Sequence, residues 1–149
     1  MLEELKFEVL QALLALPKSG LVQGTSGNVS GRQGELVVIK PSGIPYEELR
    51  PEDLVVVDLD GKVVEGKLKP SVDTLAHLEI YRALQDVGGV VHTHSTYATA
   101  FAVLNKEIPP ILPAGLVLLG PSLPVVPFAM PGSEDLGKTA VPYFEKHSA

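Results

Sequence analysis

Two histidines separated by one residue are the sharpest chemical feature of this sequence. His92 and His94 end a short run rich in β-branched residues, Val90-Val91-His92-Thr93-His94. Side chains two residues apart in a strand project to the same face, so both imidazoles can converge on one divalent cation. The spacing alone equally allows a pair of exposed or hydrogen-bonded histidines that bind no metal.

A third metal ligand would have to be a carboxylate or another histidine. The sequence contains no cysteine, which excludes thiolate ligands, thiolate nucleophiles and disulfides. Asp73 is the candidate because it stands where a helix is expected to begin, upstream of the histidine strand. His77 competes with it, four residues later on the same helix face. Taken alone, Asp73 is better explained as an N-cap and His77 as a structural histidine.

Small residues form three loops that could hold an anion. Hydroxyls, an amide and backbone N–H groups, some at a helix N-terminus, can cradle a phosphate without an arginine cluster. Lys40 and Lys69 would add positive charge. Any one loop taken alone is explained more simply as a chain reversal, and none has the spacing of a nucleotide-binding glycine motif. The loops are Gly24-Thr25-Ser26-Gly27-Asn28, Lys40-Pro41-Ser42-Gly43 and Lys69-Pro70-Ser71.

The elements that position these residues can be read from hydrophobic periodicity, Gly, Pro and capping residues. We expect a helix over 2–16 stopped by Pro17 and Gly20, a loop over 24–32, a strand between Gly34 and Pro41, helical turns over 45–54 and a hairpin over 54–66 with positive φ angles at Asp60-Gly61. Further on we expect a helix from Asp73, capped by Ser71 or Asp73, a strand over 90–95, a helix over 96–105, loops with two short strands over 108–132, and a helix capped by Ser133 that runs toward Lys146.

Length and composition limit the classes of protein to which this sequence can belong. The chain has 149 residues, which predicts one domain with its own core, and 14 Gly and 13 Pro predict many loops. Lys+Arg 12 against Asp+Glu 18 gives a net charge of −6, which argues against a nucleic-acid partner. The longest apolar stretches, around 10–16 and 111–119, are too short or too proline-interrupted to span the roughly 20 apolar residues that a bilayer crossing needs. The acidic N-terminus is unlike a signal peptide. We therefore expect a cytoplasmic protein with no membrane partner.

The order of the motifs resembles the class II aldolase/adducin family. The family includes fuculose-phosphate and rhamnulose-phosphate aldolases, ribulose-phosphate 4-epimerase and methylthioribulose-phosphate dehydratase. The resemblance implies an α/β fold, a three-layer sandwich with a central, mainly antiparallel sheet flanked by helices. It also implies a homotetramer with the site at a subunit interface. The motifs that carry it are GTSGNVS, VIKPSGIPYEEL, VVVDLDG, KPSVDTLAHLEIY and GGVVHTHS, and it extends through PFAMPGSEDL.

The same resemblance implies roles for individual residues. His92 and His94 match the family's metal-ligand pair. Asp73 matches the acidic residue that contacts the metal and serves as catalytic acid/base. The implied cofactor is Zn²⁺, with Mn²⁺ or Co²⁺ as alternatives, and the implied partner is a phosphorylated sugar. The residues that match the substrate-phosphate pocket are Gly27, Asn28, Ser42, Gly43, Ser71 and Val72.

The implied activity is metal-dependent cleavage of a phosphorylated ketose, such as fuculose 1-phosphate, to dihydroxyacetone phosphate and an aldehyde. Such cleavage passes through an enediolate, whose charge a divalent cation can stabilise while a nearby carboxylate moves the proton. Binding of the remote phosphate positions the substrate. Two alternatives stay open: 4-epimerisation of ribulose 5-phosphate by a retro-aldol/aldol route, and a non-catalytic adducin-like scaffold that has lost the metal site.

Three departures from the family pattern bear on these expectations. Asp73 is one methylene shorter than the glutamate of the aldolases, and Val72 stands where a serine hydroxyl is commoner. VIKPSG and the KPS-x-D pattern lean toward the epimerase, whereas PFAMPGSEDL is more similar to the aldolases. Family members also continue, beyond the equivalent of residues 146–149, to a His-Gly motif with a third histidine ligand. We therefore expect residues 1–149 to form a single domain that is incomplete at its C-terminus.

Overall fold

A five-stranded antiparallel sheet forms the centre of the computed structural model, which describes residues 2–113, 115–116 and 120–146. The strands lie in the order β4-β3-β2-β1-β5. They are β1 (Asn28–Gln33), β2 (Leu36–Ile39), β3 (Val55–Asp58), β4 (Val63–Glu65) and β5 (Gly89–His92). The helices are α1 (Glu3–Lys18), α2 (Thr74–Ala83), α3 (Thr96–Val103) and α5 (Glu134–Phe144), with short 3₁₀ helices η1 (Tyr46–Glu48) and η2 (Pro51–Asp53).

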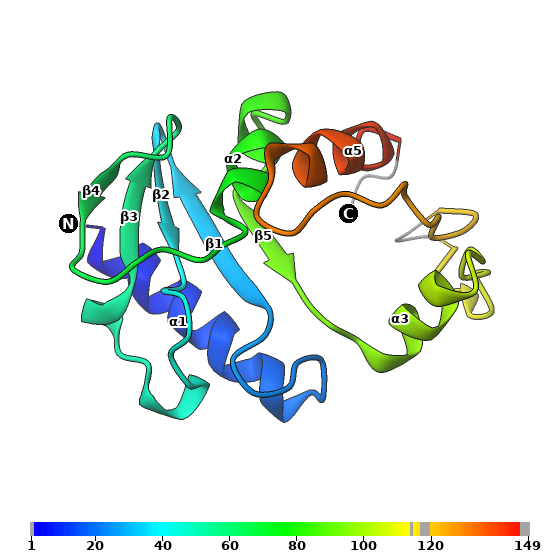
Figure 1. Ribbon diagram of the computed structural model, residues 1–149, viewed down its shortest axis with the longest axis horizontal. Coiled ribbons are helices and arrows are strands. Elements are labelled where there is room, and N and C mark those ends of the chain that lie inside the picture. The colour runs from blue at the N-terminus through cyan, green and yellow to red at the C-terminus, as the bar shows by residue number, and fades with distance from the viewer. Residues whose placement is uncertain (1, 114, 117–119, 147–149) are drawn as a thin grey trace.

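Helices cover both faces of this sheet, as Figure 1 shows. Alternate side chains of β2 and β3 point to opposite faces, so successive valines enter two separate cores. Val38 and Val56 pack on the α1 side, while Val37 and Val57 pack on the α2 side with Leu78. Helix α5 packs against α2. The expected three-layer α/β sandwich is confirmed.

Strand β1 corrects the expectation of a single loop over 24–32. It lies inside the sheet, paired with β2 on one side and β5 on the other. Its residues are small where neighbouring elements pack closely: a Cβ on Gly31 would lie 2.7 Å from Leu5 Cδ1 of α1. Ser30 Oγ lies 2.7 Å from the Nδ1 atom of His77 on the opposite layer. Tertiary contacts therefore outweigh the weak strand propensity of this sequence.

The ends of α1 and of the hairpin also differ in detail from the expectation. Helix α1 includes Pro17 and ends one residue later, because a proline in the last turn removes only one backbone hydrogen bond. The β3–β4 hairpin is confirmed, but at its turn Gly61 alone has a positive φ, of 83°. Asp58 Oδ1 holds the turn by accepting the N–H groups of Asp60 and Lys62 at 3.1 and 2.9 Å.

The chain leaves the sheet after β5. Helix α3 stands away from the sheet in Figure 1 and has no buried residue. The described part of 108–132 shows only an isolated bridge between Ile108 and Leu123 where two short strands were expected, because prolines interrupt the segment. Helix α5 begins after Ser133, as expected, but the Ser133 hydroxyl donates to Met130 O and caps nothing.

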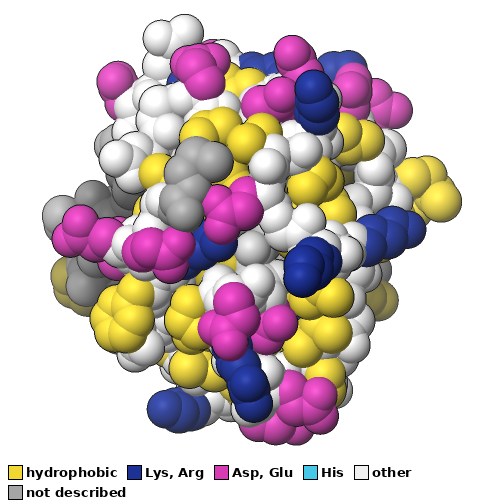
Figure 2. Space-filling view, turned by 90° about the vertical axis from the view of Figure 1, so that its left-hand side faces the viewer, with side chains coloured by type: hydrophobic (Ala, Val, Ile, Leu, Met, Phe, Trp, Pro, Cys, Tyr) yellow, Lys and Arg dark blue, Asp and Glu magenta, His cyan; other side chains and the backbone are white. Residues whose placement is uncertain are grey.

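The outer surface has no single-sign charge patch on the side that carries β4. Figure 2 shows acidic and basic side chains interspersed there, and no histidine comes into view. Among the helices of the described residues, none is both long and apolar enough to cross a bilayer.

Candidate functional site

One pocket of about 480 Å³ gathers the residues that the sequence singled out. Its walls come from the segment before β1 and the start of β1, the loop after β2, the start of α2, the end of β5, and the segment that leads into the first turn of α5. The predicted site residues that line it are Gly27, Asn28, Ser42, Gly43, Ser71, Val72, Asp73, His92 and His94. Further lining residues are Thr25, Ser26, Lys40, Pro41, Ala129, Pro131 and Leu136.

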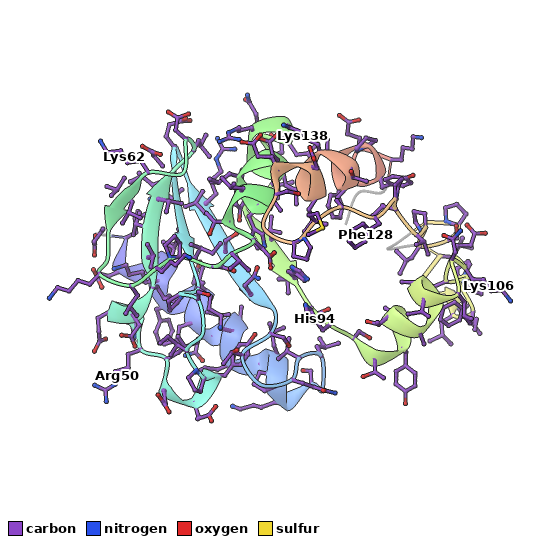
Figure 3. All side chains as sticks on the ribbon, in the orientation of Figure 1. Arg50, Lys62, His94, Lys106, Phe128 and Lys138 are labelled. Carbon is purple, nitrogen blue, oxygen red and sulfur yellow. The ribbon has the colours of Figure 1, made fainter. Side chains whose placement is uncertain are left out.

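The two histidines lie at the exit of β5. His92 is the last residue of the strand and pairs with Asn28 of β1. His94 lies beyond the strand, just past its end in Figure 3, where its backbone N–H donates to Leu21 O at 3.0 Å. The ring centroids are 5.1 Å apart and the planes are inclined by 34°. The imidazoles therefore lie side by side although the strand does not reach the second of them.

Asp73 occupies the N-cap position of α2 but does not cap the helix with its side chain. Its Oδ2 atom instead accepts a hydrogen bond from Asn28 Nδ2 at 2.9 Å and lies 3.2 Å from His92 Nδ1. The hydrogen bond with His92, aided by Asn28 and opposed by burial, lowers the pKa of Asp73 to about 2. The carboxylate is therefore ionised at neutral pH, and the N-cap interpretation is right about position and wrong about role.

The donors in the pocket fit a divalent cation by type. Two neighbouring imidazoles and a carboxylate are ligands that Zn²⁺ accepts. Within the described ranges, however, no three His, Cys, Asp or Glu side chains are arranged to enclose a metal ion. In this arrangement Asp73 holds His92 instead of completing a three-ligand set.

His77, the competing ligand candidate, does not line the pocket. It is 2% exposed, and its Nδ1 atom lies 2.7 Å from Ser30 Oγ. Its Nε2 atom is buried without a hydrogen-bond partner in the part of the chain that the structure describes. Burial lowers the pKa of His77 to about 4, so the ring is neutral at physiological pH. The interpretation of His77 as a structural histidine agrees with this position.

The two Lys-Pro-Ser loops form one paired unit beside the carboxylate. The Ser42 N–H donates to Lys69 O at 2.9 Å, and the Ser71 N–H donates to Lys40 O at 3.0 Å. This pairing brings Ser42, Gly43, Ser71 and Val72 to one wall of the pocket. Small residues, hydroxyls and a helix start thus meet at one end, which is the environment that favours an anion.

Asn28 differs from the other predicted phosphate-binding residues. Its side chain is 3% exposed and its Nδ2 atom is directed at Asp73. Its Oδ1 atom is buried, with no hydrogen-bond partner among the described residues. The geometry therefore ties Asn28 to the carboxylate as well as to the pocket wall.

Lys40, which the sequence predicts only as a source of positive charge, lines the pocket. It is 2% exposed, and its Nζ atom donates to Thr25 O at 3.2 Å and to Pro41 O at 3.5 Å. Burial lowers its pKa. Lys69 does not line the pocket. Ala129, Pro131 and Leu136 form an apolar wall of the pocket and lie in the PFAMPGSEDL segment of the family resemblance. Their place in the pocket was not predicted, because the apolar side chains themselves indicate no ligand.

Comparisons with known proteins agree with this geometry. The family described as Class II Aldolase and Adducin N-terminal domain matches residues 7–149. A solved structure described as an L-fuculose 1-phosphate aldolase is 32% identical, with a TM-score of 0.89, over 97% of this chain and 68% of its own.

Two further solved structures are similar to this chain. The L-fuculose-1-phosphate aldolase from Thermus thermophilus is 28% identical, with a TM-score of 0.81, over 99% of this chain and 74% of its own. A sugar-phosphate aldolase from Thermotoga maritima shares the fold at 22% identity and a TM-score of 0.81, over 97% of this chain and 78% of its own. The chain therefore belongs to the class II aldolase and adducin family.

Proposed function

We propose that this protein is a divalent-metal-dependent aldolase that cleaves a phosphorylated ketose, such as fuculose 1-phosphate, to dihydroxyacetone phosphate and an aldehyde. The observation that carries the proposal is the pairing of ionised Asp73 with His92 in the same pocket as the anion-favouring loops. Relatives described as fuculose-phosphate aldolases, 28% and 32% identical, support it.

Asp73 is the catalytic residue of this proposal. Its carboxylate is ionised, so it can accept a proton from a bound substrate and return it to the product. Asn28 and His92 both contact the Oδ2 atom and fix its direction. His92 and His94, with Asp73 released from its contact with His92 Nδ1, would hold Zn²⁺, or Mn²⁺ or Co²⁺, which supplies Lewis-acid polarisation of a carbonyl oxygen when bound.

The end of the pocket formed by the Lys-Pro-Ser loops would bind the substrate phosphate. The residues proposed for this role are Gly27, Asn28, Ser42, Gly43, Ser71 and Val72, and Lys40 adds a buried positive charge beside them. Binding energy gained at the phosphate, remote from the reacting carbons, would orient the substrate toward Asp73.

We also propose that the protein assembles as a homotetramer and works in the cytoplasm. Helix α3 supports the assembly, because it is apolar and has no buried residue. Tyr97 and Val103 on this helix are 84% and 80% exposed. A helix that is hydrophobic all round normally packs against other protein, and a second copy would provide such a surface.

A coupled assay for dihydroxyacetone phosphate, with fuculose 1-phosphate and added Zn²⁺, tests the proposed reaction. The proposal expects product release that depends on the metal. The second candidate, 4-epimerisation, is favoured by the short carboxylate at Asp73. It predicts interconversion of ribulose 5-phosphate and xylulose 5-phosphate without release of dihydroxyacetone phosphate. A protein that turns over neither substrate with the metal present would contradict both.

A further inference from the structure

Tyr46 lies behind the pocket without lining it. It stands in η1 and is 3% exposed. Its hydroxyl donates to Ser26 O at 2.7 Å, and the centre of its ring lies 4.9 Å from Lys40 Nζ. One buried side chain thus contacts both the loop before β1 and the buried cation of the pocket.

The loop that Tyr46 holds is tightly packed. Gly27 has a φ of +75°, and a Cβ there would lie 2.5 Å from Val22 Cγ1 and 2.9 Å from His92 O. The carbonyl of Thr25 accepts from Lys40 at 3.2 Å, and the next carbonyl, that of Ser26, accepts from Tyr46. Successive carbonyls are therefore held by the two members of one cation–π pair.

The ammonium group of Lys40 depends on these neighbours. Among the interactions of the described residues, its Nζ atom contacts two carbonyl oxygens and an aromatic face, and no carboxylate pairs with it. A buried cation without a counter-charge is costly, and carbonyls and a ring face offset part of that cost. Burial also raises the pKa of Tyr46, which keeps its hydroxyl protonated as a donor.

We propose that Tyr46 is a positioning residue for anion binding: its hydroxyl fixes the 25–27 loop, and its ring fixes the Lys40 ammonium group at the end of the pocket formed by the Lys-Pro-Ser loops. The inference rests on the proposed function, in which this end binds the substrate phosphate. A loop and a cation that are already ordered lose less conformational freedom when the anion binds, and this raises the affinity.

The substitution Tyr46→Phe tests the hydroxyl, because it keeps the ring above Lys40 and removes the hydrogen bond to Ser26 O. Tyr81→Phe is the matched control, since Tyr81 is also buried and its hydroxyl bonds to Ser30 Oγ at 2.8 Å, in the core and away from the loop. Titration calorimetry measures the Kd of inorganic phosphate, and hydrogen–deuterium exchange measures the protection of residues 24–28.

We expect Tyr46→Phe to raise the Kd of phosphate about tenfold and to speed exchange in residues 24–28. Tyr46→Leu, which also removes the ring, should weaken binding further. Tyr81→Phe should leave both readouts as in the wild type. A wild type that binds phosphate and a Tyr46→Phe variant that matches it in Kd and exchange would overturn this inference alone. Equal weakening by Tyr81→Phe would overturn it too, whereas a wild type that binds no phosphate would contradict the proposed function and this inference together.

Discussion

At the residue scale, Asp73 has the position of a helix N-cap but does not make the hydrogen bond of one. An aspartate at an N-cap usually accepts a backbone N–H, an interaction worth about 1 kcal/mol. Here the carboxylate makes no capping hydrogen bond to α2 and contacts Asn28 and His92. A residue that gives up a helix-capping hydrogen bond to contact other polar side chains is typically one with a functional role.

Replacing Asp73 by Asn tests its proposed role in proton transfer. The amide keeps the size of the side chain but cannot act as a base, so we expect kcat in the dihydroxyacetone phosphate assay to fall about 10²- to 10⁴-fold. Asp60→Asn, at an exposed turn position, is the control and should keep wild-type kcat. A kcat for Asp73→Asn close to that of the control would show that the carboxylate does not move the proton.

His77 makes stability depend on pH. Burial lowers its pKa from 6.5 to about 4, so between these values the unfolded chain binds a proton that the folded chain does not. The free energy of unfolding therefore falls as the pH drops through this window, by at most about 1.4 kcal/mol per pH unit from this group. Urea unfolding across the window checks this against His77→Gln, which cannot titrate. Parallel pH dependences for the two proteins would refute the assignment.

At the element scale, β1 shows where patterns in the sequence mislead. The hydrophobic periodicity of α1, the β3–β4 hairpin and the start of α2 are confirmed, because each signal is local. Strand β1 is missed because its small residues are suited to contacts with α1 and α2, which lie far away in the sequence. The φ angles of the hairpin turn were mispredicted for a different, local reason: the Asp58 side chain accepts hydrogen bonds from the backbone of Asp60 and Lys62.

Gly137 of α5 gives a test in which helix propensity and packing disagree. Alanine is favoured over glycine in a helix by about 1 kcal/mol, so propensity alone predicts that Gly137→Ala stabilises the protein. A Cβ there, however, would lie 2.5 Å from Ala76 O and 2.6 Å from Glu79 Cβ of α2. We expect the Tm to fall, because the backbone of α2 cannot yield easily. Gly88→Ala, with no atom within 4 Å of the added Cβ, should leave the Tm nearly unchanged, and a raised Tm for Gly137→Ala would contradict the close packing.

At the scale of the whole molecule, the sheet brings distant motifs to one pocket. The residues singled out by the family resemblance line one pocket, and β1 next to β5 explains why Asn28 and His92 meet. The contacts among Asn28, Asp73 and His92 could not be predicted, because they depend on strand register and side-chain direction. Tyr46 stands in the motif VIKPSGIPYEEL, but its contacts could not be predicted, since a buried tyrosine is common in any core.

The exposed apolar helix α3 favours assembly with other protein, and the family resemblance implies a tetramer. Sedimentation analysis should give a particle near four times the chain mass of 15.8 kDa. Val103→Glu places a charge on the exposed face of α3 and should shift the particle to smaller species, because burying an unpaired charge in an interface is costly. Phe7→Glu, on α1 at 58% exposure, is the control and should keep the large species. A wild type that sediments as a single chain would contradict the proposed tetramer.

The central claim is that His92, His94 and Asp73 form a metal-dependent active site, and zinc retention tests it most directly. Protein loaded with Zn²⁺ and then dialysed is assayed for bound metal and for dihydroxyacetone phosphate release. We predict that the wild type retains about one Zn²⁺ per chain and is active, that His92→Ala loses both metal and turnover, and that His77→Gln keeps the metal. A His92→Ala variant that retains zinc or turns over substrate like the wild type would contradict the account.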